Sequence, residues 1–346
     1  MSDITSVEQL ILKRQTELDQ IGSGNLTSDD IITLSKTDKD YALKLSEFMN
    51  YIHNNEVSEL INNVKTILTN LNVPSTNNSS FKKLESRNVD VNLQQKYGFA
   101  SDHTGSDFYD ALSADIANRN FSKIEDGDVM YMPITFNGVT RTKWMVIGVN
   151  TYDGVGDTDS GPGIVFRSVS PFGTFRMNSS NDNTIGWKGC YARSRFNSGT
   201  ESNSISVNKT TSGSLNKAIN DACNGHLRQV RRYLGNAVSA DRTWLNDYAF
   251  LPQEIEVFGC DHWANTSYYS TGVQFSAYAK APNRRIVYNE ETNTPTSRCW
   301  WWTADPATVN GSTAFCIVSY SGVAFCDNAT NAYRYVVPCF YFGVGN

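Results

Sequence analysis

Three consecutive tryptophans, Trp300 to Trp302, are the feature that most constrains how this chain can fold. Two short alternating runs around a turn at Ser321-Gly322 follow them, and an apolar stretch from Tyr335 to Phe342 comes last. Because large rings supply much apolar area for little conformational entropy, such a segment either forms a dense core or presents an adhesive face. The order predicts a particular β-rich domain, built from a tryptophan strand, a hairpin and a closing strand.

The net charge of −5 is unevenly distributed. Residues 1–73 hold six Lys/Arg against eleven Asp/Glu, and the remainder balances at 24 against 24. Without a basic field to collect phosphates, nucleic-acid binding is not expected. The first residues lack the pattern of a secretion signal and no run approaches transmembrane length, so we expect synthesis in the cytoplasm and no membrane insertion.

The cysteines are odd in number and include no C-x-x-C pair, which favours buried reduced thiols over disulfides or a zinc site. They are Cys190, Cys223, Cys260, Cys299, Cys316, Cys326 and Cys339. The four histidines form no H-E-x-x-H pattern. We therefore expect neither a metal nor a cofactor.

Residues 1–73 have the periodicity of helices and are expected to form an anchor and oligomerisation segment. One seam follows the heptad spacing of a short coiled coil, with residues Val57, Leu60, Val64, Ile67 and Leu71. This helix could pack on its own chain or join a self-associating bundle. The polar stretch from Pro74 to Ser80 separates it from the rest, which favours a homo-oligomer, with a trimer preferred.

Residues 74–123 are expected to be a linker and connector with one short helix, from about Asp107 to Asn118, capped by Ser106 or Asp107. From residue 124 the pattern changes to strands. A hairpin is predicted over Asp128–Val149 with an Asn-Gly turn, then a strand over Gly163–Val169 and helical periodicity over 214–234. The predicted class is α+β, with a small twisted antiparallel sheet and long loops over 124–346.

Six motifs appear in order over this second half. The first three are a Gly-Asp start at Gly127-Asp128, a Trp-x-Val-Ile-Gly strand at Trp144–Gly148 and a Gly-Trp-Lys-x-Cys-x-x-Arg loop at Gly186–Arg193. The last three are a strand with two glutamates at Phe250–Gly259, a Trp-Trp strand at Trp301–Pro306 and a closing strand at Tyr335–Pro338. With them the chain resembles a family of uncharacterised domains common in phage, prophage and gut-bacterial proteins. It departs from that pattern at Thr303-Ala304 and at Val336-Val337, where the family usually has Leu-Arg and Val-Arg, so a role for that arginine pair does not transfer.

Strand order and aromatic placement are also similar to the C-type-lectin-like fold of formylglycine-generating enzymes and phage tail-tip adhesins. The N-terminal part resembles phage structural proteins, in which helices with a stretch like Ser28–Lys36 precede a fibre or tip domain. The resemblance implies a virion protein, made in a bacterial host, whose N-terminal helices contact other virion proteins.

Several groups of residues suggest chemistry without fitting a known site. Cys260 and His262 are two apart and could meet as nucleophile and base, but a cysteine ending an apolar run is more often structural. Glu254 and Glu256 are expected to cap or brace a helix. The Asp153, Asp157 and Asp159 loop has the composition of a calcium loop but not its spacing, which favours a solvated hairpin tip. Cys316 and Cys326 could face one another across the last hairpin, but a copper site is not expected. We predict that the protein is not an enzyme.

The polar-aromatic loops have the Tyr, Ser and Asn composition of paratopes. The residues predicted to bind a ligand are Trp263, Tyr268, Tyr269, Tyr320, Ser321, Asn328, Asn331, Tyr333 and Arg334, whereas Trp144, Trp187, Trp300 and Trp302 are assigned to the core. The favoured function is a fibre, decoration or tail-tip adhesin that binds a host surface receptor, glycan or protein. The alternative is a structural decoration protein without a receptor.

Overall fold

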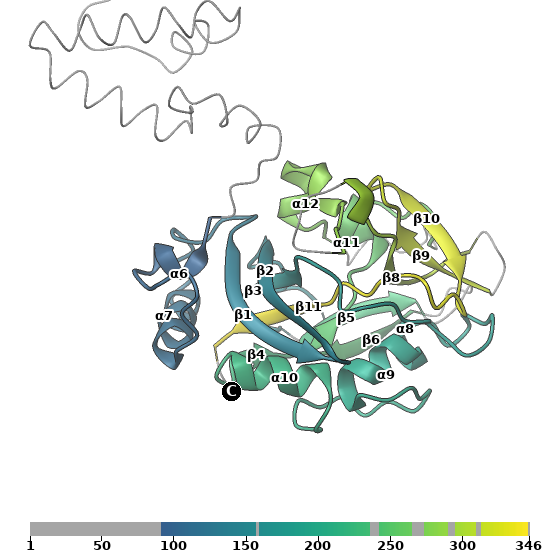
Figure 1. The fold of residues 1–346 in the computed structure, drawn as a ribbon, viewed down its shortest axis with the longest axis horizontal. Helices are drawn as coiled ribbons and strands as arrows, with labels where there is room; N and C mark the ends of the chain where they lie inside the picture. Colours follow the sequence, from purple (N-terminus) through teal and green to yellow (C-terminus); the bar gives the residue numbers. More distant parts are fainter. Residues whose placement is uncertain are drawn as a thin grey trace, which may run out of the picture. The chain divides into compact units, whose positions relative to one another are not determined.

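The computed structural model describes residues 91–156, 159–235, 242–264, 273–289, 295–308 and 313–344. All of them, drawn in colour in Figure 1, belong to one compact unit, Asn88–Asn346. This unit combines helices with sheets whose described strands pair antiparallel. The predicted mixture of α and β structure with antiparallel sheets is therefore confirmed. The heptad residues Val57, Leu60, Val64, Ile67 and Leu71 lie outside the described residues, as do Tyr268 and Tyr269.

The main sheet has the order β1-β2-β3-β11-β4, and β7 also pairs with β11. Its strands are β1 (Val129–Phe136), β2 (Val139–Val149), β3 (Gly163–Ser168), β4 (Leu227–Arg228), β7 (Ala249–Phe250) and β11 (Cys339–Gly343). The β1-β2 hairpin is as predicted, because Asn137 and Gly138 have the positive φ values, 52° and 75°, that a tight primed turn needs. The register shifts between Tyr131 and Ile134, where Pro133 cannot donate a ladder hydrogen bond.

Two smaller sheets complete the β structure. One pairs β5 (Val230–Gly235) with β6 (Arg242–Asp247), and the other has the order β10-β9-β8. The latter contains the predicted terminal hairpin, with β8 (Trp301–Pro306), β9 (Ala314–Val318) and β10 (Ala324–Asn328). Cys316 and Cys326 are register partners across it, as expected. The strand order places β10 at the edge of this sheet, as Figure 1 shows.

The predicted connector helix is α7 (Ser106–Ala117), which begins after Gly105 rather than after Ser106 or Asp107. The remaining helices are α6 (Leu93–Lys96), α8 (Gly186–Gly189), α9 (Tyr191–Ser198), α10 (Leu215–Ala222), α11 (Glu254–Phe258) and α12 (Ser276–Lys280), with 3-10 turns η1 (Pro282–Arg285) and η2 (Pro295–Ser297). None of the helices in the described part of the chain has the length and apolar character to cross a bilayer.

Two sequence predictions of secondary structure were wrong. The helix expected over 214–234 ends at Ala222, because Asn224 and Gly225 adopt positive φ values of 52° and 84° and break it. The alternation that follows belongs to β4 and β5. The strand expected over Phe250–Gly259 is mostly the helix α11, which ends at Gly259 in the left-handed conformation.

The core is aromatic, and each buried indole in it has a hydrogen-bond acceptor. The Trp144 ring lies 5.0 Å from Phe340, and its Nε1 donates to the Met132 carbonyl at 2.9 Å. Trp302 Nε1 donates to the Phe175 carbonyl at 2.7 Å. Trp144, Trp187 and Trp302 are fully buried as predicted. These bonds satisfy the indole N–H groups that burial would otherwise leave unpaired.

Candidate binding surface

Four aromatic side chains from separate segments form one continuous row, which we call the aromatic strip: Trp263, Phe325, Trp300 and Tyr320. The ring centroids are 5.6 Å apart for Trp263 and Phe325, 5.6 Å for Phe325 and Trp300, and 5.3 Å for Trp300 and Tyr320. Phe325 is 46% and Tyr320 51% exposed, and Val323 beside them is 57% exposed. A contiguous exposed apolar group of this kind is typical of interaction sites, unlike single exposed apolar residues.

The Tyr320 end of the strip is set by the turn between β9 and β10. Ser319 Oγ accepts hydrogen bonds from the backbone N–H groups of Ser321 at 3.3 Å and Val323 at 3.2 Å. Gly322 has φ +82°, which the turn requires and which other residues rarely adopt. These local bonds hold Tyr320 at the tip of the hairpin.

Three polar side chains border the strip, and we call them the polar rim: Asp327, Asn331 and Arg334. Arg334 Nε donates to Asp327 Oδ2, and its guanidinium lies 5.0 Å from the centroid of Trp300. Asn331 Nδ2 donates to the same carboxylate oxygen at 2.8 Å. The segment is fixed in place because the Tyr335 N–H donates to the Trp300 carbonyl at 2.9 Å.

The Trp263 end is held by the buried carboxylate of Glu254. Its Oε2 accepts three backbone N–H bonds, from His262 at 2.8 Å and from Trp263 and Ala264 at 2.9 Å each. Burial raises the pKa of Glu254 to about 7; the three N–H bonds oppose this shift and nearby Asp305 adds to it. A single side chain of α11 therefore positions the backbone that carries Trp263.

The structure brings several of the predicted ligand-binding residues together. Trp263 and Tyr320 belong to the aromatic strip, and Asn331 and Arg334 to the polar rim. Ser321 is exposed on the hairpin turn and Asn328 at the end of β10. Tyr333 is 82% exposed, and its ring is not among the ring contacts of the described residues. Tyr268 and Tyr269 lie outside the described residues.

The list of predicted binding residues lacks Phe325 and Asp327. Both alternate with the buried Cys326, and this alternation indicates that they lie together on the other side of β10. Trp300 was predicted to lie in the core, whereas it is only half-buried and Trp301 is fully buried in its place. All six residues of β8 are buried, so adjacent tryptophans can both lie inside. Trp300 precedes the strand and lies in the aromatic strip.

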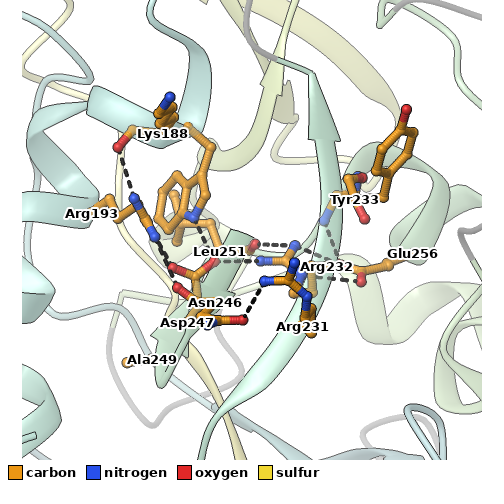
Figure 2. A network of polar contacts seen from close by, with 12 residues as sticks. Lys188, Arg193, Arg231, Arg232, Tyr233, Asn246, Asp247, Ala249, Leu251 and Glu256 are labelled. Atoms are coloured by element: carbon orange, nitrogen blue, oxygen red, sulfur yellow. Dashed lines mark hydrogen bonds and ion pairs between the residues drawn. The ribbon is translucent and has the colours of Figure 1, made fainter. Parts of the chain in front are cut away.

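Residues of two predicted motifs form a buried polar network rather than an accessible site (Figure 2). Asp247 accepts from Arg193 Nε at 2.7 Å and from Trp187 Nε1 at 2.9 Å. Arg232 Nη2 donates to Glu256 Oε2 at 2.9 Å, and Arg232 Nη1 lies 3.7 Å from Asp247. The network connects α8, α9, α11 and the β5-β6 sheet.

The two motif glutamates lie in helix α11 itself rather than on a strand beside a helix, and only Glu256 caps it. Glu256 and Gln253 form a capping box at its first turn. Glu256 also accepts from the Tyr152 hydroxyl at 2.5 Å, and burial raises the pKa of Tyr152 well above its ordinary value. Both glutamates are therefore used by the structure around them.

A comparison with protein families matches the part of the chain that contains the aromatic strip. Residues 173–342 match a family described as a domain of unknown function, DUF6273. No match was found among curated proteins, and none among solved structures. The aromatic strip, the polar rim and Glu254 all lie within the matched residues.

The remaining candidates for chemistry are the Cys260 and His262 pair and the aspartates of the loop that begins at Asp153. Cys260 Sγ lies 3.4 Å from His262 Nε2, so the two side chains do meet. Asp159 Oδ1 accepts from the N–H groups of Gly154 and Gly161 at 2.8 Å each, which lowers the pKa of Asp159. Asp153 pairs with Arg119, and Asp157 lies outside the described residues. Within the described ranges no cluster of three His, Cys, Asp or Glu side chains is arranged to hold a metal ion.

Proposed function

We propose that this chain is a virion structural protein, a fibre, decoration or tail-tip adhesin, that binds a receptor on the surface of a bacterial host. Binding takes place through the aromatic strip and the polar rim of a domain with C-type-lectin-like architecture, whose strands over residues 124–346 pack against α6 and α7. Residues 1–73 anchor the protein to other virion proteins and assemble it, as a trimer, through Val57, Leu60, Val64, Ile67 and Leu71. The protein catalyses no reaction.

The aromatic strip is the observation that carries this proposal. Rings with about half of their area exposed, next to a paired arginine and carboxylate, combine rigid apolar contact area with hydrogen-bonding groups. Tyr and Trp supply most of the binding energy at many recognition surfaces, since they bury a large area at low entropic cost. Aromatic faces suit sugars as well as protein side chains.

The test is binding of the full-length protein to host cells and to a glycan array, with Tyr320→Ala and Phe325→Ala combined. These rings are half exposed, so we expect the free energy of unfolding to change little, while binding weakens at least about tenfold. Trp244→Ala is the matched control, since Trp244 is a half-buried aromatic residue of the separate β5-β6 sheet. Equal binding by the double variant and the wild type would rule out the strip as the binding site.

A decoration protein without a receptor is the second candidate, and one observation favours it. The polar rim is satisfied internally, because Asp327 already accepts from both Asn331 and Arg334. The same contacts could serve only to stabilise the terminal hairpin. Absence of wild-type binding to cells and glycans, together with stable incorporation into particles, would support this alternative.

A further inference from the structure

Cys260 differs from the other six cysteines because its side chain reaches the surface. Cys190, Cys223, Cys299, Cys316, Cys326 and Cys339 are all buried. Burial raises the pKa of Cys190, Cys223 and Cys299 to about 12. Because the thiolate is the nucleophilic form, these six thiols are inert while the protein is folded.

The imidazole of His262 is held beside the Cys260 thiol. Its Nε2 lies 3.4 Å from Cys260 Sγ, and its ring packs edge-to-face on Phe258 at 5.3 Å and 87°. The backbone N–H of His262 is fixed by Glu254 at 2.8 Å. The His262 side chain is exposed, so a proton that it takes from the thiol can pass to water. The pair therefore has the geometry of a nucleophile and its general base.

A cation completes the surroundings of the thiol. The Arg285 guanidinium lies 4.9 Å from the centroid of Phe258, the ring that also supports His262. Desolvation lowers the pKa of Arg285, while Tyr278 and Cys260 act in the opposite direction. Arg285 Nε has no hydrogen-bond partner in the described part of the chain. Arg285 interacts electrostatically with Cys260, and its positive charge favours the negative form of the sulfur during attack.

We propose that Cys260 is a reactive thiol that undergoes thiol–disulfide exchange with small disulfides, with His262 as its general base. His262 Nε2 takes the thiol proton as Cys260 Sγ attacks one sulfur of the disulfide. A new sulfur–sulfur bond forms, the original one breaks, and the departing thiolate takes the electron pair and then a proton. Cys260 is oxidised to a mixed disulfide, and the other half of the reagent is reduced to a thiol.

This inference does not depend on the proposed receptor binding. It concerns a modification site in the segment that leads into Trp263, at one end of the aromatic strip. Cys260 is three residues before Trp263, and the backbone between them is tied to Glu254 at His262. A mixed disulfide at Cys260 would therefore add a group close to the proposed binding surface.

The experiment treats the folded full-length protein with dipyridyl disulfide and follows the thione that it releases. We expect one thiol per chain to react quickly and the other six to react only after unfolding. Cys260→Ser should abolish the fast reaction, and oxidised glutathione should give an adduct that mass spectrometry locates at Cys260. His262→Gln should slow the fast reaction at neutral pH by about tenfold or more.

His103→Gln is the matched control and should leave the rate unchanged, because His103 pairs with Asp107 in another part of the fold. If His262→Gln unfolds the protein, all thiols react together and the stoichiometry shows it. The wild type then gives the second test, since its fast rate at neutral pH should exceed, by about tenfold or more, that of a short peptide with one cysteine and no histidine. A wild-type rate no faster than that of the peptide, a fast reaction that persists in Cys260→Ser, or an equal rate in folded His262→Gln would overturn the proposal.

Discussion

At the scale of single residues, Asp247 lies between the two arginines of the buried polar network, Arg193 and Arg232. It is fully buried, and it accepts from Arg193 and Trp187 while Arg232 lies 3.7 Å away. Two arginines and two carboxylates, Asp247 and Glu256, keep the network neutral. A buried pair of this kind adds little net stability by itself, but removing one partner leaves a charge uncompensated.

We therefore predict that Asp247→Asn lowers the free energy of unfolding by about 3–5 kcal/mol. The amide cannot neutralise Arg193, and its NH2 group meets the donors of Arg193 or Trp187. Urea unfolding followed by circular dichroism measures the change. Asp221→Asn serves as the control, because Asp221 forms an exposed pair with Lys217 on α10 and its loss should have almost no effect. Equal stability of the two variants would contradict the prediction.

At the scale of elements, helix α11 is stabilised by polar contacts rather than by its own backbone hydrogen bonds. It has five residues, which is too short for a stable isolated helix. The capping box of Gln253 and Glu256 satisfies its first turn, and Glu254 ties it to the segment 262–264. The helix and the Trp263 segment should therefore respond together to the charge of Glu254.

The raised pKa of Glu254 predicts a pH dependence of stability. Since the folded chain holds this proton up to a pKa of about 7 and the unfolded chain only up to about 4.5, stability falls as pH rises between these values. The full effect is about 3 kcal/mol. Glu254→Gln keeps an oxygen for the three N–H groups but does not titrate. The difference in unfolding free energy, wild type minus variant, should therefore be smaller at pH 8 than at pH 5. A difference that is the same at both pH values would show that Glu254 is not protonated in the folded state near neutrality.

The elements also show what the sequence could predict. The β1-β2 hairpin followed from Asn137-Gly138, because its turn geometry is local. The end of α10 did not, since the apolar spacing continued past Gly225 into two strands. The aromatic strip could be predicted only in part. It depends on Trp263 and Trp300 both reaching the Phe325 ring and on Glu254 holding the backbone of residues 262–264, and neither contact leaves a periodic pattern in the sequence.

At the scale of the whole molecule, the core of the described unit extends from Leu93 on α6 to Phe342 on β11. Helix α7 contributes Phe108, Leu112 and Ile116, all fully buried, and the Ser113 hydroxyl on the same helix donates to the Gly343 carbonyl at 3.4 Å. Strands β1, β3 and β11 therefore bury part of their apolar surface against α6 and α7, which precede them in the chain.

This arrangement predicts different behaviour for two truncated chains. A chain of residues 88–346 should unfold cooperatively and keep the near-ultraviolet circular dichroism of the packed tryptophans, because it retains every core residue of the described unit. A chain of residues 124–346 loses α6 and α7, and burying one large apolar side chain alone is worth about 2–5 kcal/mol. Losing four of them costs about 8–20 kcal/mol, which is as large as the usual stability of a domain, about 5–15 kcal/mol, so this shorter chain should not fold. Light scattering on the full-length protein and on residues 88–346 tests the proposed assembly at the same time. A full-length oligomer and a truncated monomer are expected, whereas oligomers with the same number of subunits for both chains would place the contacts between subunits outside residues 1–87.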